Sequence, residues 1–152
     1  MGLQKVIDIK NRRAHFEFEF LEKFTAGLVL TGTEIKSIRL GQANMSDAWC
    51  YFSKGELYVK NLSISAYEKG THYNHEPLRP RKLLLRKREM NKLLAKIKEK
   101  GLTIVPVRLF TAESGYAKLE IALAKGKKTH DKRESIKDRE MKRDLQKVLK
   151  YK

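Results

Sequence analysis

The sequence has one cysteine and no long apolar run, and each scarcity excludes a class of protein. The single cysteine, Cys50, cannot form an intramolecular disulfide, which favours a reducing compartment. The first eight residues hold no uninterrupted apolar segment of the secretory kind, and no run approaches the roughly 18 to 20 residues that span a bilayer. We therefore expect a cytoplasmic protein without a membrane partner.

Acidic residues are also scarce, with 18 Asp and Glu against 34 Lys and Arg, so the 152-residue chain carries a net charge of +16. Residues 79–100 hold ten basic and two acidic residues, and residues 125–152 hold 12 basic and five acidic residues. Clustered positive charge is typical of proteins that bind nucleic acid, because each neutralised phosphate releases counterions. An ordinary solvated surface and an anionic membrane surface are the weaker alternatives.

Motifs for catalysis and metal binding are weak. Gly27 and Gly32 have the spacing of a phosphate-binding loop, but the Lys and Ser/Thr that should follow the second glycine are absent. His72 and His75 lie close together without a second pair of ligands, which favours two solvent-exposed histidines over a metal site. The scattered histidines and carboxylates offer an acid and a base for RNA cleavage, but their spacing gives no support. We expect no enzyme, no catalytic residue, no metal and no cofactor.

Short alternating apolar segments predict a mainly β fold. The alternation of Phe16, Phe18 and Phe20 with glutamates predicts a first strand, and an apolar run predicts a second over residues 24–30. Further strands are expected at 48–52, 57–59, 102–110 and 116–124, with short helices at 33–41 and 90–101 and an exposed loop at 68–82. Pro106 indicates an edge or a bulge. Several short strands and tight turns favour one small β-barrel with flanking helices over residues 1–124.

Exposed aromatic and basic side chains are candidates for RNA contacts. Rings stack on unpaired bases and cations contact phosphates, and the expected loop carries both kinds: Tyr67, His72, Tyr73, Arg79, Arg81 and Lys82. Core packing is the alternative for Tyr67. Trp49 and Tyr51 share one strand face, which points either outward or beneath a helix. Residues 11–13 form a polar, donor-rich element before the first expected strand.

The composition changes at Lys125. Residues 126–135 contain no large apolar side chain, so we expect residues 125–152 to be a basic tail that is disordered in the free chain. Apolar residues then recur at helical spacing, at Met141, Leu145, Val148 and Leu149. This stripe predicts a helix that forms on a partner, with docking on the body as the alternative.

Several runs of residues form a recognisable series along the chain. They include Asn11-Arg12-Arg13-Ala14, the run from Ala26 to Arg39, Gly115-Tyr116-Ala117-Lys118, and Ala124 to Lys128 followed by Asp131-Lys132-Arg133. This series resembles the small protein B family, the tmRNA-binding proteins of bacterial trans-translation, and follows the family's order across nearly the whole chain. The resemblance implies an oligonucleotide-binding-like barrel and a non-enzymatic adaptor for ribosome rescue and the tagging of incomplete proteins.

The resemblance also implies partners and contact residues. The body would bind the tRNA-like domain of tmRNA through Asn11, Arg12, Arg13, Lys36, Arg39, Lys118, Lys125, Lys127 and Lys128. The tail would enter the empty mRNA channel of the ribosome near the decoding centre and contact ribosomal RNA as a helix, through His130, Asp131, Lys132, Arg133, Lys137, Arg139 and Arg143. A basic ribosomal structural protein and a ribonuclease are the competing hypotheses. Nothing in the sequence demands a permanent oligomer, so we expect a monomer.

Overall fold

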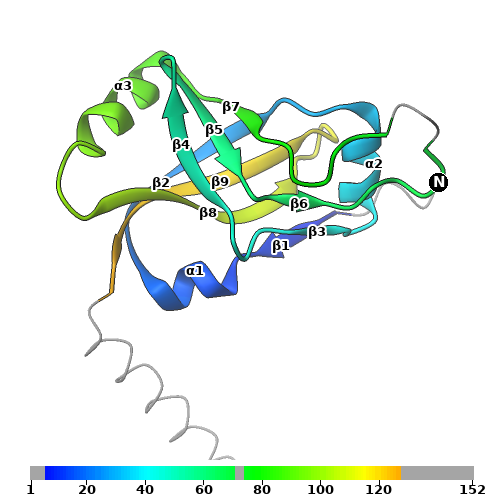
Figure 1. Ribbon diagram of the computed structural model, residues 1–152, viewed down its shortest axis with the longest axis horizontal. Coiled ribbons are helices and arrows are strands. Elements are labelled where there is room, and N and C mark those ends of the chain that lie inside the picture. Colours follow the sequence, from blue (N-terminus) through cyan, green and yellow to red (C-terminus); the bar gives the residue numbers. More distant parts are fainter. Residues whose placement is uncertain (1–5, 71–73, 128–152) are drawn as a thin grey trace, which may run out of the picture.

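A computed structural model describes residues 6–70 and 74–127. Twelve elements follow one another along these residues (Figure 1): β1 Asp8–Lys10, α1 Arg12–Glu17, β2 Phe18–Leu28, α2 Gly32–Arg39, β3 Ala43–Asn44, β4 Trp49–Ser53, β5 Glu56–Lys60, β6 Ser63–Ile64, β7 Arg81–Leu84, α3 Lys87–Lys96, β8 Leu102–Thr111 and β9 Ala117–Gly126. The sequence interpretations of His72, Tyr73, Lys128 and the whole tail from His130 onward lie outside the described residues.

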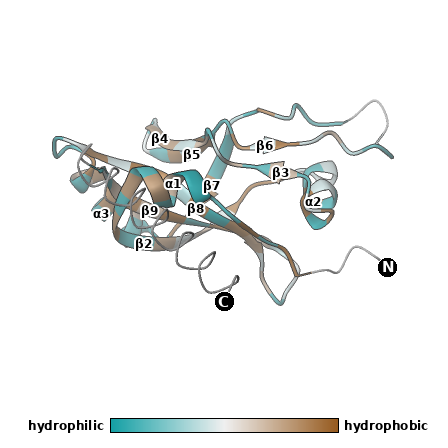
Figure 2. Cartoon of the chain, turned by 90° about the horizontal axis from the view of Figure 1, so that it is seen from below, coloured by the Kyte–Doolittle hydropathy of each residue, from teal (hydrophilic) through white to brown (hydrophobic). Residues whose placement is uncertain are grey.

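Six antiparallel strands close into a barrel in the order β8, β4, β5, β7, β2 and β9, with β9 pairing back onto β8. Strand β1 also pairs with β8, further along that strand than β4 does, and β3 pairs with β6 in a separate two-stranded sheet. Helices α2 and α3 lie at opposite ends of the molecule in both views (Figures 1 and 2). The expected mainly β barrel with flanking helices is confirmed.

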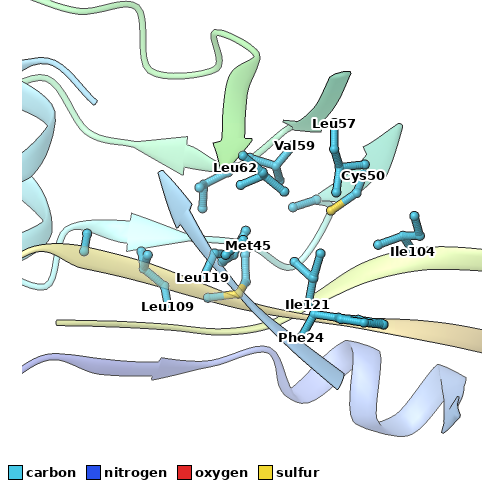
Figure 3. Packing of buried hydrophobic residues seen from close by; sticks show 14 of the residues in the cluster. Phe24, Met45, Cys50, Leu57, Val59, Leu62, Ile104, Leu109, Leu119 and Ile121 are labelled. Atoms are coloured by element: carbon cyan, nitrogen blue, oxygen red, sulfur yellow. The ribbon is translucent and has the colours of Figure 1, made fainter. Parts of the chain in front are cut away.

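Apolar side chains from the barrel strands meet in one core. Along β9, Leu119 and Ile121 are buried while Lys118 and Glu120 alternate with them toward the outside, as a half-buried strand requires. Figure 3 shows these two residues facing side chains from the other strands, among them Phe24, Cys50, Leu57, Val59, Ile104 and Leu109. Burial of this apolar surface is the main free-energy gain of folding.

The start of the first strand was predicted wrongly. Asn11 caps helix α1 by accepting a hydrogen bond from the Ala14 amide at 3.2 Å, and the helix keeps residues 12–17, so that Phe16 is helical and the strand begins at Phe18. The capping hydrogen bond favours a helix here, and an alternation of only three phenylalanines is too short to distinguish a strand from a helix. Strand β2 then runs on to Leu28 through an irregularity between Phe20 and Glu22, which joins the two predicted strands into one.

Other local predictions are confirmed, with shifts at their ends. The hairpin of β4 and β5 turns through Lys54 and Gly55, both at positive φ, and the register of β8 shifts next to Pro106 as a bulge. Helix α3 covers Lys87–Lys96, so it begins and ends earlier than the expected 90–101, and Gly101, at φ +84°, lies in the turn that leads into β8. Strand β9 continues two residues beyond its expected end at Ala124.

Candidate RNA interface

Asn11 is a structural residue of the candidate interface. Its side chain is 3% exposed, and its amide nitrogen donates to the backbone oxygens of Pro106 at 2.8 Å and Met45 at 3.2 Å. With the cap to Ala14, the side chain is fully used inside the protein. The sequence interpretation of Asn11 as a direct RNA contact is therefore corrected: Asn11 fixes the first turn of α1, whose next two residues, Arg12 and Arg13, are exposed.

The exposed arginines of α1 lie beside the end of β9. Lys127 donates from its side chain to the His15 carbonyl oxygen at 3.1 Å, and its amide bonds to the Glu17 carbonyl oxygen at 2.9 Å. We call Arg12, Arg13, Lys125 and Lys127 the α1 cluster. The pKa of Arg13 is raised, mainly by its hydrogen bond to Glu17. Its second carboxylate partner is Asp47 at 2.6 Å.

The remaining predicted cations lie at the α2 end of the barrel. Arg39 donates to the Gly115 carbonyl oxygen at 3.2 Å, which connects α2 to the turn between β8 and β9. The ammonium of Lys36 lies 5.5 Å from the centre of the Tyr67 ring, so Tyr67 contacts a surface lysine. Lys118, half-buried, follows the same turn in β9. We call Lys36, Arg39 and Lys118 the α2 cluster.

The structure therefore divides the predicted RNA contacts between two places. Strand β9 carries Lys118 near one end and Lys125 near the other. Seven residues of extended strand separate them by about 23 Å. The spacing of seven residues can be read from the sequence, but it corresponds to this distance only because both lysines lie on one continuous strand.

Glu34 is a buried charged residue that the sequence interpretation passed over. It accepts hydrogen bonds from Arg79 at 2.5 Å and from Arg81, and it completes a capping box with Thr31. Burial opposes ionisation of this carboxyl, but hydrogen bonds from Arg79, from the Thr31 amide and from Arg81 outweigh it and lower its pKa. The sequence pattern Thr31-x-x-Glu34 signals the cap. No local signal identifies the two arginine partners.

The cations of the expected exposed loop pair with carboxylates of the protein, Arg81 in the core and Lys82 at the surface. Arg81 is fully buried at the start of β7 and donates to the carbonyl oxygens of Leu62 at 2.5 Å and Pro77 at 3.1 Å. Lys82 pairs with Glu56 at 2.8 Å. The interpretation of residues 68–82 as an exposed loop that offers these cations to phosphates is thus wrong for Arg81, because its buried carboxylate partner draws it into the core.

His75 was also expected in solvent, but it is buried. Its Nε2 lies 2.8 Å from the Ile64 carbonyl oxygen, which can only accept, so Nε2 carries the hydrogen. Nδ1 then accepts from the Thr33 hydroxyl at 2.9 Å. Within residues 6–70 and 74–127, no three His, Cys, Asp or Glu side chains gather as metal ligands.

Trp49 and Tyr116 are exposed at the surface. Trp49, 42% exposed, faces outward and packs on Tyr51 with ring centres 5.3 Å apart, which decides the alternative that the strand pattern left open. Tyr116 is 72% exposed, in the turn that Arg39 contacts. It borders a cleft of about 610 Å³ between α2 and that turn. In the part of the chain that the structure describes, no helix is long and apolar enough to cross a membrane.

Comparisons with known proteins cover nearly the whole chain. The model of the family described as SmpB protein matches residues 8–151. The SsrA-binding protein of Cytophaga hutchinsonii is 60% identical over 144 residues, which cover 95% of this chain and 94% of that protein. The SsrA-binding protein of Bacteroides thetaiotaomicron is 55% identical over 147 residues, 97% of this chain and 98% of that protein.

Among solved structures, a chain of "tmRNA-SmpB: a journey to the center of the bacterial ribosome" is similar with a TM-score of 0.67 and 48% sequence identity. The similarity covers 82% of this chain and 85% of that chain.

Proposed function

This chain belongs to the SmpB protein family, and from that membership we propose that it is an RNA-binding adaptor for trans-translation. It binds the tRNA-like domain of tmRNA and delivers it to stalled ribosomes, where incomplete proteins are tagged. The names of its relatives, SsrA-binding proteins, and of a similar structure, a tmRNA-SmpB ribosome assembly, support this function. Because the protein acts on the ribosome, we place it in the cytoplasm.

One observation carries the proposal: exposed and half-buried cations gather at both ends of strand β9. The α1 cluster and the α2 cluster are about 23 Å apart along the strand. A small ligand cannot contact both places, whereas a folded RNA presents phosphates over such a span. The buried Asn11 and the bond from Arg39 to Gly115 hold the two clusters on rigid elements, so that their spacing selects a shape.

The proposal assigns a second role to the end of the chain. The body that holds tmRNA runs on to Lys127, beyond the expected boundary at residue 124, because β9 ends at Gly126 and Lys127 bonds to α1. Residues 128–152 form a basic tail that occupies the empty mRNA channel. The tail contacts are those that the family resemblance implies, from His130 to Arg143. Ten basic against five acidic residues in this tail suit a channel lined by RNA phosphates.

The first test compares the tRNA-like domain of tmRNA with an ordinary tRNA of equal size over a series of salt concentrations. Phosphate attraction alone weakens equally on both RNAs as salt rises. We expect the preference for the tRNA-like domain to persist at high salt. Parallel loss of both complexes would contradict recognition of tmRNA and favour the basic ribosomal protein as the alternative.

Charge-removing variants test the two clusters separately. Lys118→Gln and Lys125→Gln should each reduce the slope of log K against log salt by about 1, the effect of one lost phosphate contact. Lys54→Gln, in the hairpin turn of β4 and β5, is the matched control and should leave the slope unchanged. Equal effects of all three variants would mean that the positive charge acts without a defined interface.

A further inference from the structure

The cleft at the α2 end of the barrel lies beside the α2 cluster, and the phosphate contacts proposed for the two clusters do not use it. Its lining comes from the end of β2 and the residues after it, from α2, and from the turn between β8 and β9. Its volume of about 610 Å³ falls within the range of small-ligand sites. It is lined by Leu28, Val29, Leu30, Thr31, Gly32, Ile35, Arg39, Ser114, Gly115, Tyr116 and Ala117.

The apolar side of the cleft is unusually exposed. Tyr116 is 72% exposed and Val29 is 44% exposed, while both line the same hollow. Among residues 6–70 and 74–127, the Tyr116 ring stacks on no other ring and its hydroxyl has no hydrogen-bond partner. A large ring held at a cleft without a partner offers one free face for stacking.

The polar side of the cleft carries uncompensated positive charge. Arg39 spends one nitrogen on the Gly115 carbonyl oxygen, which leaves further donors of its guanidinium for a ligand. Arg39 pairs with no carboxylate among the described residues, in contrast to Arg13, Arg79, Arg81 and Arg108. The cleft therefore combines a free aromatic face with a fixed cation.

We propose that this cleft receives a single unstacked nucleotide of the bound RNA. The base stacks on Tyr116 and contacts Val29 and Ile35, and the neighbouring phosphate pairs with Arg39. Stacking on an aromatic ring with a cation at the backbone is the usual means of holding unpaired nucleotides. The site rests on the proposed function and adds recognition of an unpaired position to the phosphate contacts of the two clusters.

Variants of Tyr116 separate stacking from other effects. Tyr116→Ala should weaken binding to the tRNA-like domain by about 5- to 150-fold, the range that stacking of one base supplies. Tyr116→Phe keeps the ring and should bind within about twofold of the unchanged protein. Leu78→Ala removes an exposed apolar side chain outside the cleft and should leave the affinity unchanged. Equal binding by all four proteins would overturn the proposal.

Salt dependence distinguishes the two halves of the site. Tyr116→Ala should lower the affinity without changing the slope of log K against log salt, because no phosphate contact is lost. Arg39→Gln should reduce that slope by about 1. A changed slope in Tyr116→Ala would mean that the ring only supports a phosphate contact, and would refute stacking.

Photocrosslinking locates the nucleotide. A photoreactive phenylalanine analogue at position 116 should crosslink to one unpaired nucleotide of the tRNA-like domain, and the same analogue at position 49 should give no crosslink there. Crosslinks spread over a paired stem would overturn the proposal. The proposed function fails separately, if the unchanged protein has no preference for the tRNA-like domain. If that preference is intact but Tyr116→Ala has no effect on binding, only the nucleotide site is refuted.

Discussion

Replacement of Glu34 tests whether one buried carboxylate holds the α2 end of the protein together. Glu34 and Arg81 are both fully buried, and Glu34 is the only carboxylate that pairs with Arg81 among the described residues. Glu34→Gln keeps the shape but removes the charge, which leaves the guanidinium of Arg81 buried without a counter-ion. Breaking a buried pair in this way costs about 3 to 5 kcal/mol.

The carbonyl oxygens of Leu62 and Pro77 remain as acceptors for Arg81, so we expect a loss near 3 kcal/mol in the free energy of unfolding. Arg79 contributes little to this figure because a third of its side chain is exposed. Urea denaturation of the full chain measures the loss at pH 7.

Glu22→Gln is the matched control for this loss. Glu22 pairs with Lys92 at 2.7 Å on the surface, and both side chains are well exposed. An exposed pair is worth about 1 kcal/mol or less. A loss below about 1 kcal/mol for Glu34→Gln, or one equal to that of Glu22→Gln, would refute the argument from burial.

Three further predictions concern stability. The pKa of Glu34 is lower in the folded than in the unfolded chain, so its contribution is complete above its ordinary value of 4.5 and disappears as the pH falls through the folded value; urea titrations should therefore converge for Glu34→Gln and the unchanged protein in acid, and a constant gap would contradict this. Asn11→Ala should lower the free energy of unfolding by about 2 kcal/mol, through the lost cap and the lost hydrogen bonds to the carbonyl oxygens of Pro106 and Met45, of which Met45 still accepts from the Ala48 amide, and it should weaken RNA binding; unchanged stability would show that water replaces the amide. Gly55→Ala, at φ +79° in the β4–β5 turn, should lower the free energy of unfolding by about 1 kcal/mol and so lower the melting temperature, whereas Gly126→Ala, without a positive φ, should leave the melting temperature unchanged.

The candidate site was predictable in its residue types and not in its arrangement. Motifs that resemble the SmpB family identified the cations of both clusters, because charged residues in family order can be read along the chain. Asn11 carries the same motif signal as Arg12 and Arg13, but its side chain points inward to Met45 and Pro106. A motif records that a residue is required and does not distinguish contact with RNA from support of the fold.

Local physical chemistry by itself determined much of the fold. The β4–β5 hairpin depends on the residues of its own turn, the bulge in β8 on Pro106, and the start of α2 on a cap within four residues. Alternation of apolar and polar residues likewise determined that Lys118 faces away from the core. Each of these features involves neighbours in sequence, so the sequence alone contains the cause.

Only the tertiary structure decided which polar residues are buried and which cations gather at each end of the barrel. Arg81 is buried because Glu34, 47 residues away, meets it in the core, and Phe16 is helical because Asn11 anchors α1 against Met45 and Pro106. The cleft exists because Arg39 joins α2 to Gly115 across 76 positions of sequence. Burial and pairing at such separations depend on the closed barrel, since only its closure brings the partners together and excludes water from them.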